Sequence, residues 1–312
     1  MSKIGFVFPG QGSQHVGMLE ELASRYALIT EHFTEVSNTL GYDLWQLIQQ
    51  GPEEQLNQTE YTQVAMLTAD VAVYHLMQQL KPCQVKSLAG HSLGEYAALV
   101  AANALSLTEA AKLVAKRGQL MQSKLPLGLG AMAAIVGLTN EEVESLCIKA
   151  SNTNYQVTPA NYNAIGQVVI AGHFSAVEKA LELANQLGAK LAKLIPVSVP
   201  CHCPLLKDAA EAFAENLAEV NFKKPDFSVI SNVDLSIYQS PMQIRTLLKE
   251  QLYSPVRWVE TIQFMKKNEI EIIFECGPGK VLNGLIKRID RSIIAISVND
   301  LQSLDQALNL SF

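Results

Sequence analysis

The stretch that decides the fold class is residues 85–96, VKSLAGHSLGEY. Residues 85–89 are short and mostly apolar and predict a buried strand, while residues 93–103 are rich in Ala and Leu and predict a helix. Between them Ser92 is the centre of a Gly-x-Ser-x-Gly motif. A serine at such a corner sits on a tight turn with its hydroxyl projecting, so Ser92 is a candidate nucleophile. The alternative is an ordinary serine in the first turn of a helix.

Length and composition set the broad class of protein. The chain has 312 residues, which predicts about two domains, and its 48% hydrophobic residues predict a large core. A formal net charge of −6 argues against a nucleic-acid-binding protein. The apolar stretch at residues 4–8 is too short for a signal peptide or a membrane span. We therefore expect a globular enzyme or binding protein that does not enter a membrane.

The cysteines indicate the cellular compartment. There are five, an odd number, and none has Cys-x-x-Cys spacing, which favours a reduced cytoplasmic protein. The run Cys201-His202-Cys203 contains metal-ligand types. It lacks a fourth ligand and the usual ligand spacing, so we expect no metal.

The first part of the chain predicts a parallel sheet. A buried-type strand at residues 4–8 is followed by helical patterns through Gln79, with breaks at Gly41 and Gly51. After the Ser92 corner, a capping box at Ser106-x-x-Glu109 opens a helix that ends near Lys124. Strands that alternate with helices are typical of a parallel α/β fold.

From Gly128 the pattern changes to the order β-α-β-β-α-β, which predicts a ferredoxin-like unit. We place its elements at 131–136, a helix capped by Thr139-x-x-Glu142, 157–160, 167–171, a helix capped by Ser175-x-x-Glu178, and 190–195. The larger pattern then resumes, with strands at 227–231, 270–274 and a closing strand at 293–298. The predicted fold is a hydrolase-like, mostly parallel α/β domain (1–127 and 199–312) with an inserted ferredoxin-like α+β domain (128–198).

Two further residues could act with Ser92. A serine hydroxyl needs a base, and His202 lies where the chain returns from the small domain, in the serine-before-histidine order of hydrolase-like sheets. No Asp or Glu between them stands out as a third member, so a carbonyl or an amide could orient the imidazole. Arg117 follows on an apolar helix and could bind a carboxylate with its two-pronged guanidinium. The alternative for Arg117 is a structural ion pair.

Six motifs occur in the order found in malonyl-CoA:acyl carrier protein transacylases, and the chain resembles that family, in its stand-alone bacterial form, over essentially its whole length. The motifs are FPGQGSQ (8–14), GHSLGE (90–95), Arg117-Gly118, Asn161-x-Asn163, VPCH (199–202) and GPGK (277–280). The family commonly has serine before the histidine where this chain has Cys201, which leaves the preference for the extender unit less sharply defined.

The resemblance implies the roles of eight residues. These are Ser92 as nucleophile, His202 as general base and acid, Arg117 as the malonyl carboxylate site, Gln11 and Leu93 as backbone oxyanion donors, Gln251 as the carbonyl that orients His202, and Gln63 and Asn161 beside the acyl pocket.

The activity implied is ping-pong transfer of malonyl from malonyl-CoA to the phosphopantetheine thiol of acyl carrier protein, in fatty acid biosynthesis, by a cytoplasmic monomer without a bound cofactor. The carrier proteins of this family's pathway are acidic, so we expect local basic residues to dock them. The candidates are Lys190, Lys193, Lys287 and Arg288. The alternatives are a serine esterase or thioesterase on a related sheet, and a non-catalytic module that binds the carrier.

Overall fold

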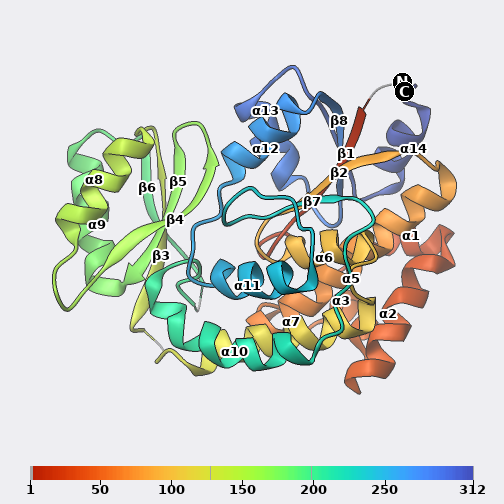
Figure 1. Cartoon of the computed structure of the whole chain (residues 1–312), viewed down its shortest axis with the longest axis horizontal. Coiled ribbons are helices and arrows are strands. Elements are labelled where there is room, and N and C mark those ends of the chain that lie inside the picture. Colours follow the sequence, from red (N-terminus) through yellow and green to blue (C-terminus); the bar gives the residue numbers. More distant parts are fainter. Residues whose placement is uncertain (1–2, 127, 198, 312) are drawn as a thin grey trace.

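A parallel β-sheet forms the centre of the larger part of the molecule (Figure 1). The computed structural model describes residues 3–126, 128–197 and 199–311. The sheet has the order β7-β2-β1-β8-β9, and all its neighbouring strands run parallel. Its members are β1 (Lys3–Phe8), β2 (Val85–Gly90), β7 (Ser228–Ile230), β8 (Ile270–Cys276) and β9 (Ile294–Val298). The predicted parallel α/β core is confirmed.

Helices cover both faces of this sheet, because successive side chains of a strand point to opposite sides. Phe6 and Phe8 of β1 lie in one apolar cluster, and Val7 between them lies in another. The helices of this part are α1 (Glu20–Arg25), α2 (Ala27–Leu40), α3 (Leu44–Gln50), α4 (Glu53–Leu56), α5 (Thr59–Leu80), α6 (Gly94–Ala101), α7 (Leu107–Ser123), α10 (Lys207–Glu219), α11 (Pro241–Gln251), α12 (Trp258–Lys267), α13 (Val281–Ile289) and α14 (Leu301–Asn309), with a 3-10 turn η1 (Pro204–Leu206).

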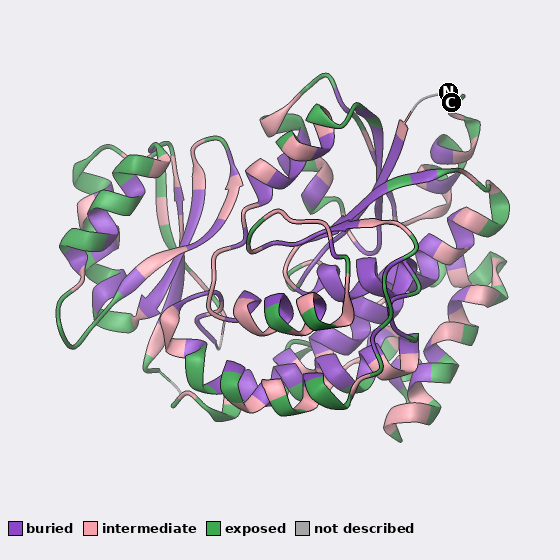
Figure 2. Cartoon of the chain, in the orientation of Figure 1, coloured by how far each residue is buried: buried purple, intermediate pink, exposed green. Residues whose placement is uncertain are grey.

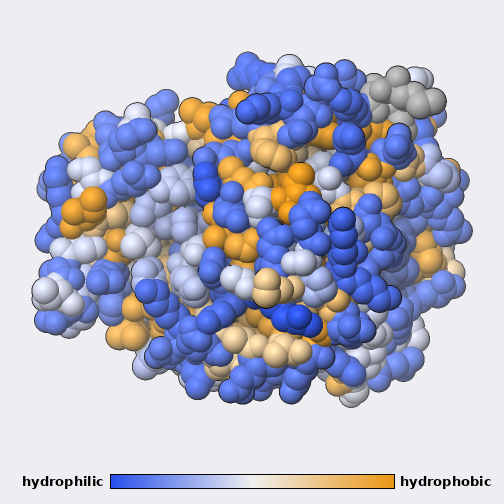
Figure 3. Space-filling model, in the orientation of Figure 1, coloured by the Kyte–Doolittle hydropathy of each residue, from blue (hydrophilic) through white to orange (hydrophobic). Residues whose placement is uncertain are grey.

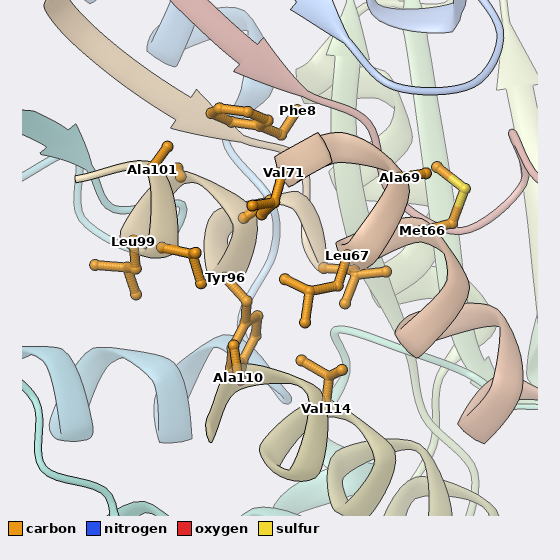
Figure 4. Packing of buried hydrophobic residues seen from close by; sticks show 14 of the residues in the cluster. Phe8, Met66, Leu67, Ala69, Val71, Tyr96, Leu99, Ala101, Ala110 and Val114 are labelled. Atoms are coloured by element: carbon orange, nitrogen blue, oxygen red, sulfur yellow. The ribbon is translucent and has the colours of Figure 1, made fainter. Parts of the chain in front are cut away.

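Helix α5 is the most deeply buried of the long helices, as its purple colour in Figure 2 shows. It packs against α2, α6 and α7. In Figure 4 Leu67 and Val71 of α5 lie beside Tyr96 of α6 and Val114 of α7. This apolar contact fixes the start of α6, just after Ser92, relative to α7, which carries Arg117.

A second, smaller sheet lies to the left of the first in Figure 1. Its order is β4-β5-β3-β6 with antiparallel pairs throughout, which is the ferredoxin-like arrangement that the sequence predicts. Helices α8 and α9 pack on one face and enclose a separate apolar core. The elements are β3 (Gly130–Val136), α8 (Asn140–Ala150), β4 (Val157–Ala164), β5 (Gln167–His173), α9 (Phe174–Gln186) and β6 (Leu191–Ile195).

The predicted boundaries of the small domain fall at residues 127 and 198, which lie outside the described residues. Strand β4 reaches across to the larger part, since Tyr162 N–H donates to the Val256 carbonyl (2.9 Å) and Val256 N–H donates to the Ala160 carbonyl (2.8 Å). That residues 128–198 form a domain of their own stays a prediction.

Three helix N-caps are predicted from the sequence, and the structure confirms two of them. Capping boxes are present at Ser106 with Glu109 and at Thr139 with Glu142, as predicted. The predicted cap at Ser175 is wrong, because α9 begins one residue earlier and Ser175 lies inside it. The Phe174 N–H donates instead to the Leu129 carbonyl (2.9 Å), so main chain replaces the side-chain cap.

The end of the chain also differs from the sequence-based prediction. The sequence predicts that a strand at 293–298 is the last element; β9 occupies residues 294–298, but it is not the last element. Helix α14 then follows, with Asp300 as its N-cap, accepting from the Ser303 N–H (2.7 Å). Leu304 and Ala307 of α14 are three residues apart, so they lie on one face of the helix and pack into the main core.

The surface is mostly hydrophilic in the view of Figure 3, with apolar patches that are small and scattered. Within residues 3–126, 128–197 and 199–311, no helix is both long and apolar enough to cross a membrane. The five cysteines are all free thiols.

Candidate active site

Ser92 lies on the corner between β2 and α6, with a left-handed φ of 53°. Such a φ is strained for a residue with a side chain, and it is typical of an exposed nucleophile elbow. The flanking glycines are required by contact. A Cβ on Gly90 would lie 1.8 Å from the Gly94 carbonyl carbon, and one on Gly94 would lie 2.0 Å from the Phe8 carbonyl oxygen. Strand and helix therefore meet here only because both positions lack side chains.

His202 contacts the serine hydroxyl directly. Its Nε2 lies 2.7 Å from Ser92 Oγ, and its Nδ1 lies 2.8 Å from the Gln251 main-chain oxygen. A carbonyl oxygen can only accept, so Nδ1 carries the proton and Nε2 is free to accept one from the hydroxyl. Burial and the positive charge of Arg117 lower the pKa of His202 to about 3. The imidazole is therefore neutral at neutral pH, with Nε2 unprotonated.

Arg117 lies on the other side of the hydroxyl, and only 1% of its surface is exposed. One guanidinium nitrogen, Nη2, lies 3.3 Å from Ser92 Oγ and 2.9 Å from the side-chain oxygen of Gln251. Its Nε is buried and has no hydrogen-bond partner among the described residues. Helix α7 reaches this depth because Gly118 packs on α5, where a Cβ would lie 2.6 Å from Glu60 Cα. A buried guanidinium with a free donor is suited to a carboxylate.

A cavity of about 240 Å³ opens in front of these three side chains. It lies between the carboxyl ends of the parallel strands and the small sheet, where ligands of open α/β sheets bind. The remaining predicted residues, Gln11, Leu93, Gln63 and Asn161, all line it. Its apolar wall comes partly from the small sheet, through Met132, Val169 and Ile195, and from the following segment, through Val197, Val199 and Cys201.

Comparison with known proteins identifies the family. Residues 5–299 match the model of the acyl transferase domain. The malonyl CoA-acyl carrier protein transacylase of Haemophilus influenzae is 50% identical over 309 residues, 98% of each chain. The chain belongs to the malonyl-CoA:acyl carrier protein transacylases.

Solved structures of this family superpose closely on the chain. The transacylase from Coxiella burnetii has a TM-score of 0.96 and 48% identity, covering 98% of this chain and 97% of its own. A malonyl-transacylase in complex with its type II PKS acyl-carrier protein has a TM-score of 0.96 and 47% identity, covering 98% and 99%. Both support the arrangement of the two sheets described above.

The transacylase site contains side chains that sequence reasoning missed. Asn232, just after β7, accepts from the Ser92 N–H through Oδ1 (2.8 Å) and donates to the Gly90 carbonyl through Nδ2 (2.7 Å). Glu95 is fully buried one turn after the serine. Glu95 ends the GHSLGE motif, and Asn232 follows a predicted strand at the ligand-binding end of the sheet. Nothing in the sequence indicates that Glu95 and Asn232 are in contact.

His91 connects the elbow to the small sheet. Its Nε2 lies 2.8 Å from Asn163 Oδ1 on β4, and its ring lies 5.5 Å from that of Trp258. Burial lowers the pKa of His91, so its ring is neutral. His91 thus contacts the small sheet, whereas the side chains that contact Ser92 Oγ are His202 and Arg117.

The four predicted docking residues lie outside the cavity and are exposed. Arg288 on α13 donates to Gln167 Oε1 at the start of β5 (2.6 Å). Gln167 pairs with Val136, whose carbonyl accepts from the Lys190 N–H (2.8 Å). The two basic pairs, 190 with 193 and 287 with 288, are therefore close to one end of the small sheet.

The Cys201-His202-Cys203 run is not arranged as a metal site. Within the part of the chain that the structure describes, no group of three His, Cys, Asp or Glu side chains could hold a metal ion. The Cys201 and Cys203 thiols donate to the Val199 and Pro200 carbonyls, and burial raises the pKa of each.

Proposed function

We propose that the chain transfers a malonyl group from malonyl-CoA to the phosphopantetheine thiol of acyl carrier protein, through a malonyl ester of Ser92. The single observation that carries this proposal is that a histidine and an arginine both contact the hydroxyl of Ser92. Ser92 Oγ lies 2.7 Å from the His202 base and 3.3 Å from the Arg117 cation. A plain esterase needs the base but has no use for a buried guanidinium beside it.

In the first half-reaction the malonyl carboxylate binds Arg117, which places the thioester carbonyl over Ser92. Ser92 Oγ attacks the carbonyl carbon as its proton passes to His202 Nε2. The tetrahedral intermediate then expels the CoA sulfur, which takes the proton back from His202. The carbonyl of Gln251 holds the imidazole in the tautomer that this exchange needs.

The backbone N–H groups of Gln11 and Leu93 are the proposed oxyanion donors. Both residues line the cavity, and the Leu93 N–H stands at the start of α6, where helix N–H groups lack an internal acceptor. Among the described residues neither amide donates to another group. Loss of one such donor typically lowers turnover by about 10²–10³.

In the second half-reaction the carrier's thiol takes the place of CoA. His202 accepts the proton of the thiol, the sulfur attacks the malonyl-serine, and Ser92 leaves with that proton. Gln63 and Asn161 are the proposed polar contacts of the acyl group, since each lines the cavity and has an amide side chain. The apolar wall beside them keeps the cavity poor in water, which favours transfer over hydrolysis.

The basic residues 190, 193, 287 and 288 are the proposed docking surface for an acidic carrier. Their place at one end of the small sheet supports a single patch. We also expect the chain to act as a monomer in the cytoplasm, where five free thiols are stable.

The test is intact-mass measurement of the protein after mixing with malonyl-CoA, with and without carrier. The wild type gains a malonyl adduct that disappears when carrier is added, and Ser92→Ala gains none. Ser13→Ala, in a loop beside the same cavity, is the matched control and keeps the adduct. Release of free malonate at the same speed without carrier would identify an esterase instead.

A further inference from the structure

The side chain of Gln251 connects Arg117 to a buried carboxyl group. Its Oε1 accepts from Arg117 Nη2 (2.9 Å), and its Nε2 donates to Glu95 Oε2 (2.7 Å) and to the Ser92 carbonyl (2.9 Å). An amide can make these contacts in one orientation only, since its oxygen accepts and its nitrogen donates. Cation, amide and carboxylate therefore form a directed chain.

Glu95 is surrounded by donors. Besides Gln251, the Tyr238 hydroxyl donates to Oε1 and the Asn232 N–H donates to Oε2 (3.2 Å). The three donors stabilise the ionised form of Glu95, whereas its full burial opposes the charge. Through Asn232, whose side chain holds the Ser92 N–H, the same carboxyl group also supports the elbow.

The charges in this region come close to balance without substrate. Arg117 carries one positive charge, and its guanidinium also lies over the Tyr96 ring (5.5 Å). The charged or titratable groups that face Glu95 are Arg117 from α7, Tyr238 from the segment after β7, and Tyr96 on its own helix. A malonyl carboxylate on Arg117 adds a second negative charge to a buried region, which is costly unless one is neutralised.

We propose that Glu95 is a positioning residue that serves as the resting counter-charge of Arg117 through the Gln251 amide, and that arrival of the malonyl carboxylate is coupled to uptake of one proton by Glu95. This rests on the proposed role of Arg117. The proton comes from solvent, and no bond other than the carboxyl O–H forms.

The ionisation of Glu95 falls in the range that this coupling needs. Burial raises its pKa to about 7, against the lowering effects of Tyr238, Gln251, Asn232 and Arg117. Burial raises the pKa of Tyr238 well above its ordinary value, so that hydroxyl remains a donor. His202 has its pKa near 3 and stays neutral throughout this range. A change of selectivity near neutral pH therefore does not come from the base.

The sign of the effect follows from linkage. Ionised Glu95 repels the malonyl carboxylate, so preference for malonyl-CoA over acetyl-CoA falls as pH rises through the pKa of Glu95. Acetyl-CoA carries the same CoA groups without the carboxylate, so the ratio of the two acylation rates removes effects common to both. We expect the ratio to fall roughly tenfold between about pH 6 and about pH 8.5, since one pKa unit of coupling is a factor of ten.

Two substitutions separate charge from shape. Glu95→Gln keeps the size, and its amide can turn so that NH2 faces the Tyr238 oxygen while C=O accepts from Gln251 and Asn232. Glu95→Gln should hold the malonyl-to-acetyl ratio at its low-pH value across this pH range.

Tyr238→Phe removes one donor from the carboxylate, so the pKa of Glu95 rises and the fall in the ratio moves to higher pH. Glu275→Gln, another buried carboxyl group, which instead caps α13, is the control and should leave the profile unchanged.

Proton uptake can be measured directly. Ser92→Ala cannot be acylated, so its calorimetric titration with malonyl-CoA in buffers of different ionisation enthalpy counts the protons taken up on binding. We expect a fraction of one proton for malonyl-CoA near pH 7, more than for acetyl-CoA, and no difference after Glu95→Gln is added. A flat wild-type ratio, or equal uptake for both ligands, would overturn the proposal. Arg117, as the residue proposed to bind the malonyl carboxylate, is called the clamp below. If Arg117→Ala keeps its malonyl preference, the clamp of the proposed function has failed instead, and the two failures are distinct.

Discussion

The two sides of Ser92 are built from different kinds of contact. On one side, His202 is held by the main-chain oxygen of Gln251. On the other side, Arg117 is held by the side-chain oxygen of the same residue. A main-chain contact survives substitution of the residue that provides it, whereas a side-chain contact does not. We therefore expect substitution of Gln251 to leave the proposed base, His202, in place and to disturb the proposed carboxylate-binding residue, Arg117.

The largest effect is expected on the base side. His202→Ala removes the acceptor 2.7 Å from Ser92 Oγ, so acylation by both malonyl-CoA and acetyl-CoA should slow by roughly 10²–10⁴. Because the base serves every acyl group, the ratio of the two rates should change little. Rapid-mixing mass measurement of the adduct gives both rates. An unaffected acylation rate would remove His202 from the mechanism.

The second effect belongs to the clamp. Arg117→Ala should cost malonyl transfer about 2–5 kcal/mol, the typical loss of a buried charged partner, and should remove the preference over acetyl-CoA. Arg117→Lys should recover little, because an ammonium cannot form the paired contact.

Arg245→Ala is a matched control for this loss. Its guanidinium also donates to two carbonyls, those of Leu217 and Val220, in partly buried hydrogen bonds, but it is not among the residues that line the cavity. We expect it to lower thermal stability without changing selectivity. A full malonyl-to-acetyl ratio in Arg117→Ala would mean that the carboxylate binds elsewhere.

The third prediction concerns Gln251, the residue that contacts His202 through its main chain and Arg117 through its side chain. Gln251→Ala keeps the carbonyl that orients His202 and deletes the amide that holds Arg117. Malonyl transfer should fall by roughly ten- to a hundredfold, as for a lost hydrogen bond to a charged group, and acetyl transfer should fall less. Gln243→Ala, at the other end of α11, is the control. Equal losses for both substrates would show that the base side also depends on this side chain.

Much of the nucleophile's surroundings could be predicted from sequence, because the elbow is local. Gly90 is required by its contact with Gly94, which lies within a few residues of Ser92, and the order of Ser92, Arg117 and His202 is visible along the chain. The resemblance to the family added the carbonyl of Gln251, which the structure places 2.8 Å from His202 Nδ1. Such features need no knowledge of how distant strands pair.

The support of the clamp could not be predicted, because it depends on which strands are neighbours. Glu95, Asn232 and Gln251 meet only because β7 lies beside β2 and α11 returns over that edge. No local pattern fixes that order. The wrong prediction of a cap at Ser175 has the same origin, since a main-chain carbonyl from another segment, Leu129, takes the place of a side chain.

The smallest effect is expected at the rim, where solvent screens charges that are not buried. Lys287→Glu with Arg288→Glu should raise the Michaelis constant for the carrier, on the order of tenfold at low salt, because rim charges act on the association rate. The effect should fade as salt rises, since the screening length is about 8–10 Å at moderate ionic strength. Acylation by malonyl-CoA should change much less, because the buried charges of Arg117 and Glu95 are untouched.

The control for the rim is an adjacent pair of exposed lysines near the start of β7, Lys223→Glu with Lys224→Glu. It makes the same change in net charge at the edge of the sheet opposite the cavity, so a general effect of charge on an acidic carrier appears in both variants. A local docking site affects only the 287–288 variant. Carrier-dependent transfer measured against salt, beside acylation alone, separates the two. If both half-reactions respond equally, or if the control pair responds as strongly, the carrier docks elsewhere and the contrast between rim and cavity fails with it.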